Sequence, residues 1–186
     1  MTPPPVYVFD LETTSLDPNA GKIVAASVFG PGVAFSYADP GYEPDVLDAF
    51  FDTLSDLPVD ARLTTWNGWG FDLNWLRTAD LEVVSPLSFR ETTETSKYGS
   101  PLLRATFRGH DVGDVYYQTC WPTWAVRQGL PSTGLKAVAQ AALGVTPHDI
   151  DVTRLSDYTD EQIAGYCLDD SRWTWTLWEL RSLAAA

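Results

Sequence analysis

The sequence predicts an α/β fold in which a mixed β-sheet is flanked by helices. Two observations support this fold class: three strand-like stretches rich in β-branched and aromatic residues come first, and a helix–strand–helix alternation follows them. The chain has 186 residues, of which 45% are hydrophobic, and this composition suffices for a sizeable core. Because we find no internal repeat, low-complexity tract or linker, we expect residues 1–186 to form a single domain.

The first three strands are expected to form an antiparallel meander. Residues 6–14 are almost continuously apolar up to two acids, as in a strand that is covered on both faces. A turn rich in proline, asparagine and glycine separates them from a second strand at residues 22–29. A Gly-Pro-Gly turn at residues 30–32 then leads into a third strand at residues 33–37.

The middle of the chain alternates between helix and strand. Residues 45–57 carry an apolar stripe at helical spacing that ends at Pro58, and residues 61–66 predict a fourth strand. Residues 71–79 predict a short helix. The stretch 82–108 mixes Ser, Thr, Glu and Arg without a clear period, so we predict no element there.

A short strand and three helices are expected in the last part of the chain. The strand covers residues 109–114, and the first helix covers residues 115–127 although it contains Pro122. The second helix runs through residues 135–142 and ends at Gly144. Its cap is expected from one of two hydroxyl side chains, Ser132 or Thr133.

Composition excludes several classes of protein. The chain carries 25 acidic and 12 basic side chains and a net charge of −13, whereas proteins that grip duplex DNA through many phosphates are usually basic. Three possibilities remain for a protein of this charge that acts on nucleic acid: a local binding site, a partner that delivers the substrate, or operation at high salt. We expect a soluble, cytoplasmic protein without membrane contact, because there is no apolar run of membrane length and no signal peptide. Cys120 and Cys167 lack a metal-binding spacing and are expected to be reduced thiols.

Asp10 and Glu12 end the first apolar stretch at a spacing of two residues. Side chains alternate along a strand, so the two carboxylates point the same way and repel each other beside a buried strand. A divalent cation, Mg²⁺ or Mn²⁺, would compensate this repulsion because hard cations prefer oxygen ligands. The alternative is that the strand has ended and both acids are solvated loop residues.

The last helix carries a second informative acid. It opens with Thr159 and Gln162 at the spacing of a capping box, and Asp170 falls in the middle of its apolar stripe, one turn after Tyr166. An uncompensated carboxylate on such a face is costly. Asp72 lies in the same way on the apolar face of the short helix, although the helix dipole alone would also explain an acid in the first turn. Together these acids favour a metal site.

Three stretches resemble the three motifs of the DEDD 3′–5′ exonucleases. They are Phe9-Asp10-Leu-Glu12-Thr-Thr, Trp66-Asn67-Gly-Trp-Gly-Phe71-Asp72 and Tyr166-Cys-Leu-Asp-Asp170. The third is of the type with tyrosine four residues before the last aspartate. Two further stretches, Gly113-Asp114-Val-Tyr116 and residues 130–144, are similar to the same family. The resemblance is closest to the proofreading exonuclease domain of family B DNA polymerases, and it spans nearly the whole chain in the correct order.

The resemblance implies a ribonuclease-H-like fold with a mixed, mostly five-stranded sheet flanked by helices. It implies a metal-dependent 3′–5′ exonuclease that hydrolyses phosphodiester bonds at the 3′ end of single-stranded DNA by a two-metal mechanism, releasing nucleoside 5′-monophosphates. The chain stops just after the third motif, so we expect a stand-alone nuclease or the exonuclease subunit of an assembly.

The resemblance also implies roles for five residues. Asp10 would bridge two Mg²⁺ or Mn²⁺ ions, Glu12 and Asp170 would complete the site that activates water, and Asp72 would support the second ion. Tyr166 would orient the attacking water, since its ordinary pKa near 10 makes it a poor base. If Tyr166 were only a core residue, its replacement by phenylalanine would be tolerated.

Eight side chains are candidate contacts to nucleic acid: Thr13, Asn67, Trp69, Phe71, Arg90, Lys97, Arg104 and Arg108. By the resemblance, Thr13 and Asn67 would contact the terminal nucleotide and Phe71 would pack against its base. The alternatives are an exposed hydroxyl at the end of a strand for Thr13, a turn residue for Asn67 and a core residue for Phe71. Trp69, set between glycines, would stack on a base, although tryptophans are more often core. The basic residues alternate with aromatic ones, as in a single-strand groove, or form a solvated loop.

Two other functions remain open from the sequence. One is 3′ processing of RNA, because the same motifs occur in RNA exonucleases and none of them senses the 2′-hydroxyl. The other is a non-catalytic, exonuclease-like module that binds a polymerase or replication partner. The retention of all five catalytic-type residues argues against the module.

Overall fold

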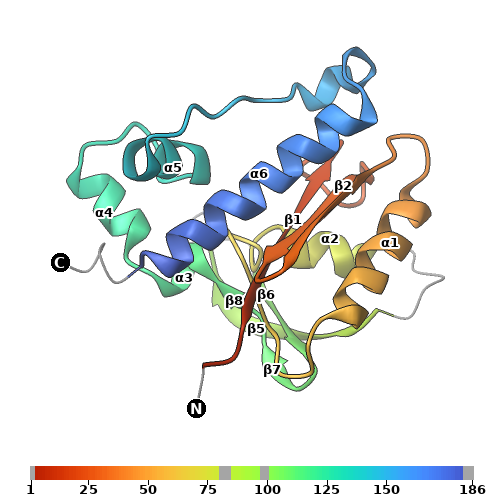
Figure 1. The fold of residues 1–186 in the computed structure, drawn as a ribbon, viewed down its shortest axis with the longest axis horizontal. Helices are drawn as coiled ribbons and strands as arrows, with labels where there is room; N and C mark the ends of the chain where they lie inside the picture. The colour runs from red at the N-terminus through yellow and green to blue at the C-terminus, as the bar shows by residue number, and fades with distance from the viewer. Residues whose placement is uncertain (1–2, 80–84, 97–100, 182–186) are drawn as a thin grey trace.

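A five-stranded mixed sheet forms the centre of the structure, with helices on its faces (Figure 1). The computed structural model describes residues 3–79, 85–96 and 101–181. The order of the strands is β3-β2-β1-β4-β8. Their bounds are Val6–Thr13 for β1, Ile23–Gly30 for β2, Val33–Ala38 for β3, Arg62–Thr65 for β4 and Gly113–Asp114 for β8. The predicted α/β fold class, with a mixed five-stranded sheet flanked by helices, is therefore confirmed.

The register of the sheet sets the direction of the site residues. β1, β2 and β3 form the predicted antiparallel meander, and β1 also pairs in parallel with β4. Asp10 lies opposite Ser27 in this register, and the pairing of β1 with β2 shifts between Glu12 and Thr13. Such an irregularity bends a strand and changes the direction of the side chains next to it.

Helices cover both faces of this sheet (Figure 1). On one face the apolar side chains of α1 pack with Phe9 and Leu11 of β1. On the other face α6 crosses β1, β2 and β3. The bounds are Glu43–Asp56 for α1, Asp72–Thr78 for α2 and Asp160–Glu179 for α6. The capping box of α6 is confirmed, because Thr159 accepts from the backbone of Gln162 and the side chain of Gln162 accepts from the backbone of Thr159.

A second, three-stranded sheet takes two of its strands from the stretch 82–108, for which the sequence predicted no element, and its third from the predicted strand 109–114, which is divided into β7 and β8. It consists of β5 (Leu87–Thr95), β6 (Pro101–Phe107) and β7 (His110–Asp111), paired antiparallel. Its inner residues, such as Leu87 and Phe107, join the core that α1 also covers. β5 could not be predicted because most of that strand is exposed on both faces, which removes the usual alternation of apolar and polar residues.

Two local predictions about the helices were wrong. The stretch 115–127 is not one helix but two, α3 (Val115–Gln118) and α4 (Trp121–Arg127). Pro122 lies in the first turn of α4, where the backbone N–H that proline lacks would have no partner within the helix. Neither Ser132 nor Thr133 caps α5 (Leu135–Leu143). The cap position is Gly134, and the Ser132 hydroxyl instead accepts from the Gly134 backbone N–H at 3.0 Å.

The remaining element is a short 3-10 segment, Val152–Asp157, that leads into α6. A second core lies between α3, α4, α5 and the end of α6, and it holds Trp66, Trp121 and Trp173. Within the part of the chain that the structure describes, no helix has the length and apolarity needed to cross a membrane.

Candidate active site

The four predicted acids and Tyr166 line one cleft. The cleft has a volume of about 460 Å³ and is formed by the end of β1, the turn before α2, the start of α5 and the middle of α6. These segments are far apart in the sequence, so the fold is what gathers the carboxylates. We call Asp10, Glu12, Asp72 and Asp170 the acidic cluster.

Asp10 and Glu12 leave β1 on the side that α6 covers. Burial raises the pKa of Asp10 well above its ordinary value, and the charges of Asp72, Glu12 and Asp170 raise it further. Burial also raises the pKa of Glu12 to about 8, with a further contribution from Asp170. Without a cation, the folded protein therefore disfavours the ionised form of both side chains.

Asp72 is the first residue of α2 and is 2% exposed. Its Oδ1 accepts a hydrogen bond from the backbone N–H of Leu11 at 3.2 Å. This bond holds the Asp72 carboxylate against β1, at the residue between Asp10 and Glu12. Burial raises the pKa of Asp72 to about 7, although hydrogen bonds from backbone N–H groups oppose the rise. The position in a first turn fits the helix dipole as well, but the carboxylate also lines the cleft.

Asp170 and Tyr166 lie one turn apart on α6 and face the same cleft. The Oδ1 atom of Asp170 is buried and has no hydrogen-bond partner among the described residues. Burial raises the pKa of Asp170 to about 7. Burial and the neighbouring charges of Glu12 and Asp170 raise the pKa of Tyr166 as well, so its hydroxyl stays protonated and can donate a hydrogen bond.

Lys136 is a site residue that the sequence did not identify. Its Nζ donates hydrogen bonds to the Tyr166 hydroxyl and to the Asp149 carboxylate. The positive charge lowers the pKa of Glu12 and of Asp170, against the effect of burial. Lys136 lies in a stretch that resembles the exonuclease family, but only the folded chain shows that it meets Tyr166, which is 30 residues away.

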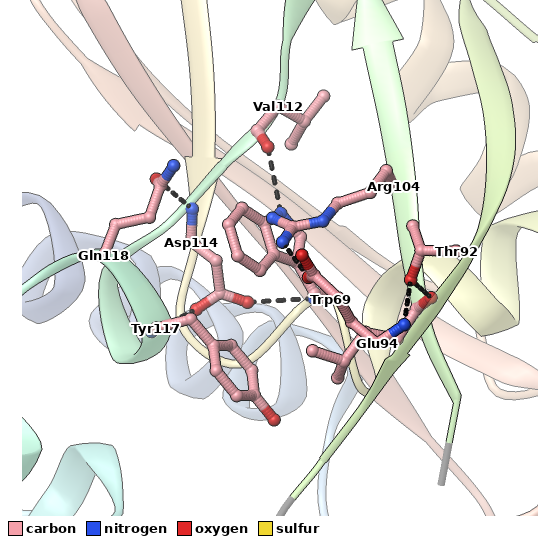
Figure 2. A network of polar contacts seen from close by, with 9 residues as sticks. Trp69, Thr92, Glu94, Arg104, Val112, Asp114, Tyr117 and Gln118 are labelled. Carbon is pink, nitrogen blue, oxygen red and sulfur yellow. Dashed lines mark hydrogen bonds and ion pairs between the residues drawn. The ribbon is translucent and has the colours of Figure 1, made fainter.

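Asp114 holds the turn that positions Asp72 in the cleft. Its carboxylate is fully buried and accepts hydrogen bonds from four backbone N–H groups, those of Asn67, Trp69, Tyr116 and Tyr117, at 2.9–3.3 Å. Figure 2 shows the contact with Trp69. Burial raises its pKa to about 6, and these hydrogen bonds oppose the rise. Because a carboxylate offers only acceptors, it can satisfy four converging donors where an amide could not. Asp114 thereby holds the Asn67–Asp72 turn against the start of α3.

The structure assigns Trp69 to the core and leaves no free face for a base. Its side chain is 5% exposed, and the indole N–H donates to the Val112 carbonyl at 2.9 Å (Figure 2). Tyr117 stacks on one side at 5.7 Å between ring centroids, and the Arg104 guanidinium carbon lies 3.1 Å from the ring centroid. These neighbours cover the ring in the structure, which argues against the predicted base stacking by Trp69.

Most of the basic residues predicted to line a single-strand groove do not reach the cleft. Arg104 pairs with Glu94 and covers Trp69, as Figure 2 shows. Arg108 donates hydrogen bonds of 2.6 Å to three backbone carbonyls at the end of α1, those of Ser55, Leu57 and Pro58, so its guanidinium caps the C-terminus of that helix. Arg90 is exposed on β5 and does not line the cleft, and Lys97 lies outside the described residues.

The three residues predicted beside the terminal nucleotide separate into two groups. Asn67 and Phe71 line the cleft next to Asp72. Asn67 has a φ of 63°, which marks a strained turn position, and its backbone N–H is held by Asp114. Thr13 is buried outside the cleft lining, and its hydroxyl donates to the Ser15 carbonyl at 2.7 Å, so the turn after β1 already uses it.

The acidic cluster suits a hard divalent cation. Four carboxylates from three segments share a site in which the pKa of each is raised, and one buried oxygen of Asp170 has no hydrogen-bond partner in the part of the chain that the structure describes. A stable fold gains nothing from this arrangement without a compensating charge. The ligand atoms of Asp10 and Glu12 also lie close enough to share one ion. The donor set is mostly oxygen, which Mg²⁺ and Mn²⁺ prefer.

Comparison with known families shows to which superfamily the chain belongs. Residues 7–181 match a family model described as the RNase H superfamily. The chain belongs to the RNase H superfamily. This membership confirms the fold expected from the three motifs and supports a nuclease-like function that acts on nucleic acid. A search of the curated proteins gives no match.

This RNase H superfamily chain is similar in fold to the family B DNA polymerase from the hyperthermophilic archaeon Pyrobaculum calidifontis. The TM-score is 0.63 at 20% sequence identity, and the alignment covers 96% of this chain and 25% of the polymerase. The chain thus spans about a quarter of the length of that polymerase. At this identity the likeness shows the fold alone.

Proposed function

We propose that the chain is a metal-dependent 3′–5′ exonuclease of the DEDD type with a catalytic tyrosine, acting on single-stranded DNA. The observation that carries this proposal is the convergence of the acidic cluster and Tyr166 on one cleft, with a buried Asp170 oxygen that has no hydrogen-bond partner among the residues described. Membership of the RNase H superfamily and the fold shared with a DNA polymerase support it. The products would be nucleoside 5′-monophosphates.

The residues of the cleft would have different roles in hydrolysis. Two Mg²⁺ or Mn²⁺ ions, when bound, would polarise the phosphodiester and lower the pKa of a water molecule. Asp10, Glu12, Asp72 and Asp170 would hold these ions. The protonated Tyr166 hydroxyl would orient the attacking water, and Lys136 would fix the position of that hydroxyl. Because the pKa of Tyr166 is raised, it would act as a hydrogen-bond donor and not as the base.

The residues that line the cleft support a single-stranded end as the substrate. Asn67 and Phe71 stand beside Asp72, where they could contact the sugar and base of a terminal nucleotide. Tyr116 and Tyr117 line the same cleft and add aromatic surface. A net charge of −13 gives no broad basic surface for duplex DNA, so binding would depend on this local site or on a polymerase or replication partner. Both cysteines are free, which fits the cytoplasm.

The test uses a 5′-labelled single-stranded DNA and an RNA of the same sequence, each with Mg²⁺, Mn²⁺ or EDTA. We expect a ladder that shortens from the 3′ end only with a metal, and that is absent with a folded Asp10→Ala variant. The ratio of the DNA rate to the RNA rate assigns the substrate. If neither nucleic acid is cleaved under any metal and salt condition, the exonuclease proposal is refuted.

A further inference from the structure

Cys167 places a thiol directly against the acidic cluster. It lies on α6 between Tyr166 and Asp170 and is fully buried. Its Sγ is 3.4 Å from the Asp10 backbone oxygen, 3.7 Å from Asp10 Oδ2 and 3.3 Å from Ser27 Oγ. Ser27 also donates to the Cys167 carbonyl at 2.9 Å, so this part of α6 is fixed on β2. The thiol therefore has a defined position and not merely a place in the core.

The spacing of these atoms matches that of ligands around one zinc ion. Zinc binds sulfur at about 2.3 Å and carboxylate oxygen at about 2.1 Å, so two tetrahedral ligands of these kinds lie about 3.6 Å apart. Cys167 Sγ and Asp10 Oδ2 are 3.7 Å apart. Glu12 completes a group in which all three ligand atoms lie within 4.8 Å of one another.

A second observation also points to a missing ligand here. Asp170 is 9% exposed, its Oδ1 has no partner among the described residues, and it lines the cleft that Asp10 and Glu12 line. It lies three residues after Cys167, hence on the same side of α6. The thiol and this carboxylate thus approach the cluster from one helix.

We propose that the acidic cluster also binds the thiophilic cation Zn²⁺, in a mode in which the Cys167 thiolate joins Asp10 and Glu12 as a ligand. Binding would displace the thiol proton to solvent. Because Zn²⁺ in this mode uses the carboxylates that Mg²⁺ or Mn²⁺ needs, it would hold the protein inactive. This inhibition rests on the proposed nuclease function, whereas the binding mode itself does not.

The test uses Cd²⁺ as a spectroscopic substitute for Zn²⁺ in the full chain. Cys120 is the only other cysteine and lies at the start of α4, so a Cys120→Ser background removes its thiol. In that background we expect Cd²⁺ to produce a sulfur-to-metal charge-transfer band that saturates at a single equivalent and is lost on adding excess Zn²⁺. The band should be absent after Cys167→Ser or Cys167→Ala, and Asp10→Asn should weaken Cd²⁺ binding.

The thiol should matter for thiophilic cations alone. We expect Cys167→Ser to weaken Zn²⁺ binding by about tenfold or more and to change Mn²⁺ binding by less than about twofold, since Mn²⁺ prefers oxygen. The inference is overturned if the Cys120→Ser protein gives no charge-transfer band, or if folded Cys167→Ser and Cys167→Ala variants bind Zn²⁺ as tightly as their parent. A band without any nuclease activity would refute the proposed function and leave this inference standing.

Discussion

Replacing Asp170 with asparagine should stabilise the metal-free protein at pH 8 and destabilise it at pH 4. The pKa of Asp170 rises from 3.8 to about 7 on folding, chiefly because the side chain is buried. The folded chain therefore holds this proton more tightly than the unfolded chain, and stability that is present below pH 3.8 is lost as the pH rises through about 7.

The size of this effect follows from the two pKa values. At about 1.4 kcal/mol for each pH unit, ionised Asp170 costs the metal-free protein about 4 kcal/mol at pH 8. Asparagine removes that cost and also removes a charge that raises the pKa of Asp10, Glu12 and Asp72. It leaves a buried amide at a place where Asp170 Oδ1 has no partner within the described ranges, which costs about 1–3 kcal/mol. The net expectation is a gain of about 2 kcal/mol at pH 8 and a loss of about 2 kcal/mol at pH 4.

Urea unfolding of chelator-treated protein at both pH values measures this difference. Tryptophan fluorescence is a suitable probe, because the chain has eight tryptophans. The free energy of unfolding of wild type should also rise when Mn²⁺ is added at pH 8, and that of Asp170→Asn should rise much less. If Asp170→Asn destabilises the metal-free protein equally at pH 4 and pH 8, the raised pKa argued for Asp170 is not present.

Three further substitutions separate the roles of the neighbouring residues. Tyr166→Phe should lower the cleavage rate by about 100-fold with little change in thermal stability, since only the water-orienting hydroxyl is lost; an unchanged rate would assign Tyr166 to the core. Lys136→Met should raise the pH of half-maximal Mn²⁺ binding by about one unit, because Lys136 lowers the pKa of Glu12 and Asp170; an unchanged midpoint in a Mn²⁺ titration would contradict this role. Trp69→Ala should cost about 3–5 kcal/mol in urea unfolding, whereas intact stability with weakened DNA binding would restore its predicted stacking role.

The positions of the acids could be predicted because they depend on local periodicity. The alternation along β1 puts Asp10 and Glu12 on one side, and helical spacing puts Asp170 one turn after Tyr166. Both patterns hold in the structure, where these side chains line one cleft with Asp72. A buried carboxylate on an apolar face is also conspicuous in a sequence, because a core position normally excludes it.

The nucleic-acid contacts could not be predicted because they depend on contacts between distant segments. Arg104 reaches Trp69 and Arg108 reaches the end of α1, about 50 residues earlier, so residues that seemed free to bind phosphate are already used. Lys136 was overlooked for the same reason, since its contact with Tyr166 joins α5 to α6. The hairpin of β5 and β6 was missed because its exposed strand lacks alternation.

The most direct test of the account is Mn²⁺ binding to the acidic cluster, measured from the electron paramagnetic resonance signal of free Mn²⁺. Asp169→Asn is a matched control, because Asp169 precedes Asp170 but pairs with Arg172 at 2.9 Å and does not line the cleft. We predict that wild type and Asp169→Asn bind Mn²⁺ alike, and that Asp10→Asn binds it at least about tenfold more weakly. Equal Mn²⁺ binding by folded Asp10→Asn and Asp169→Asn would contradict a metal site at this cleft.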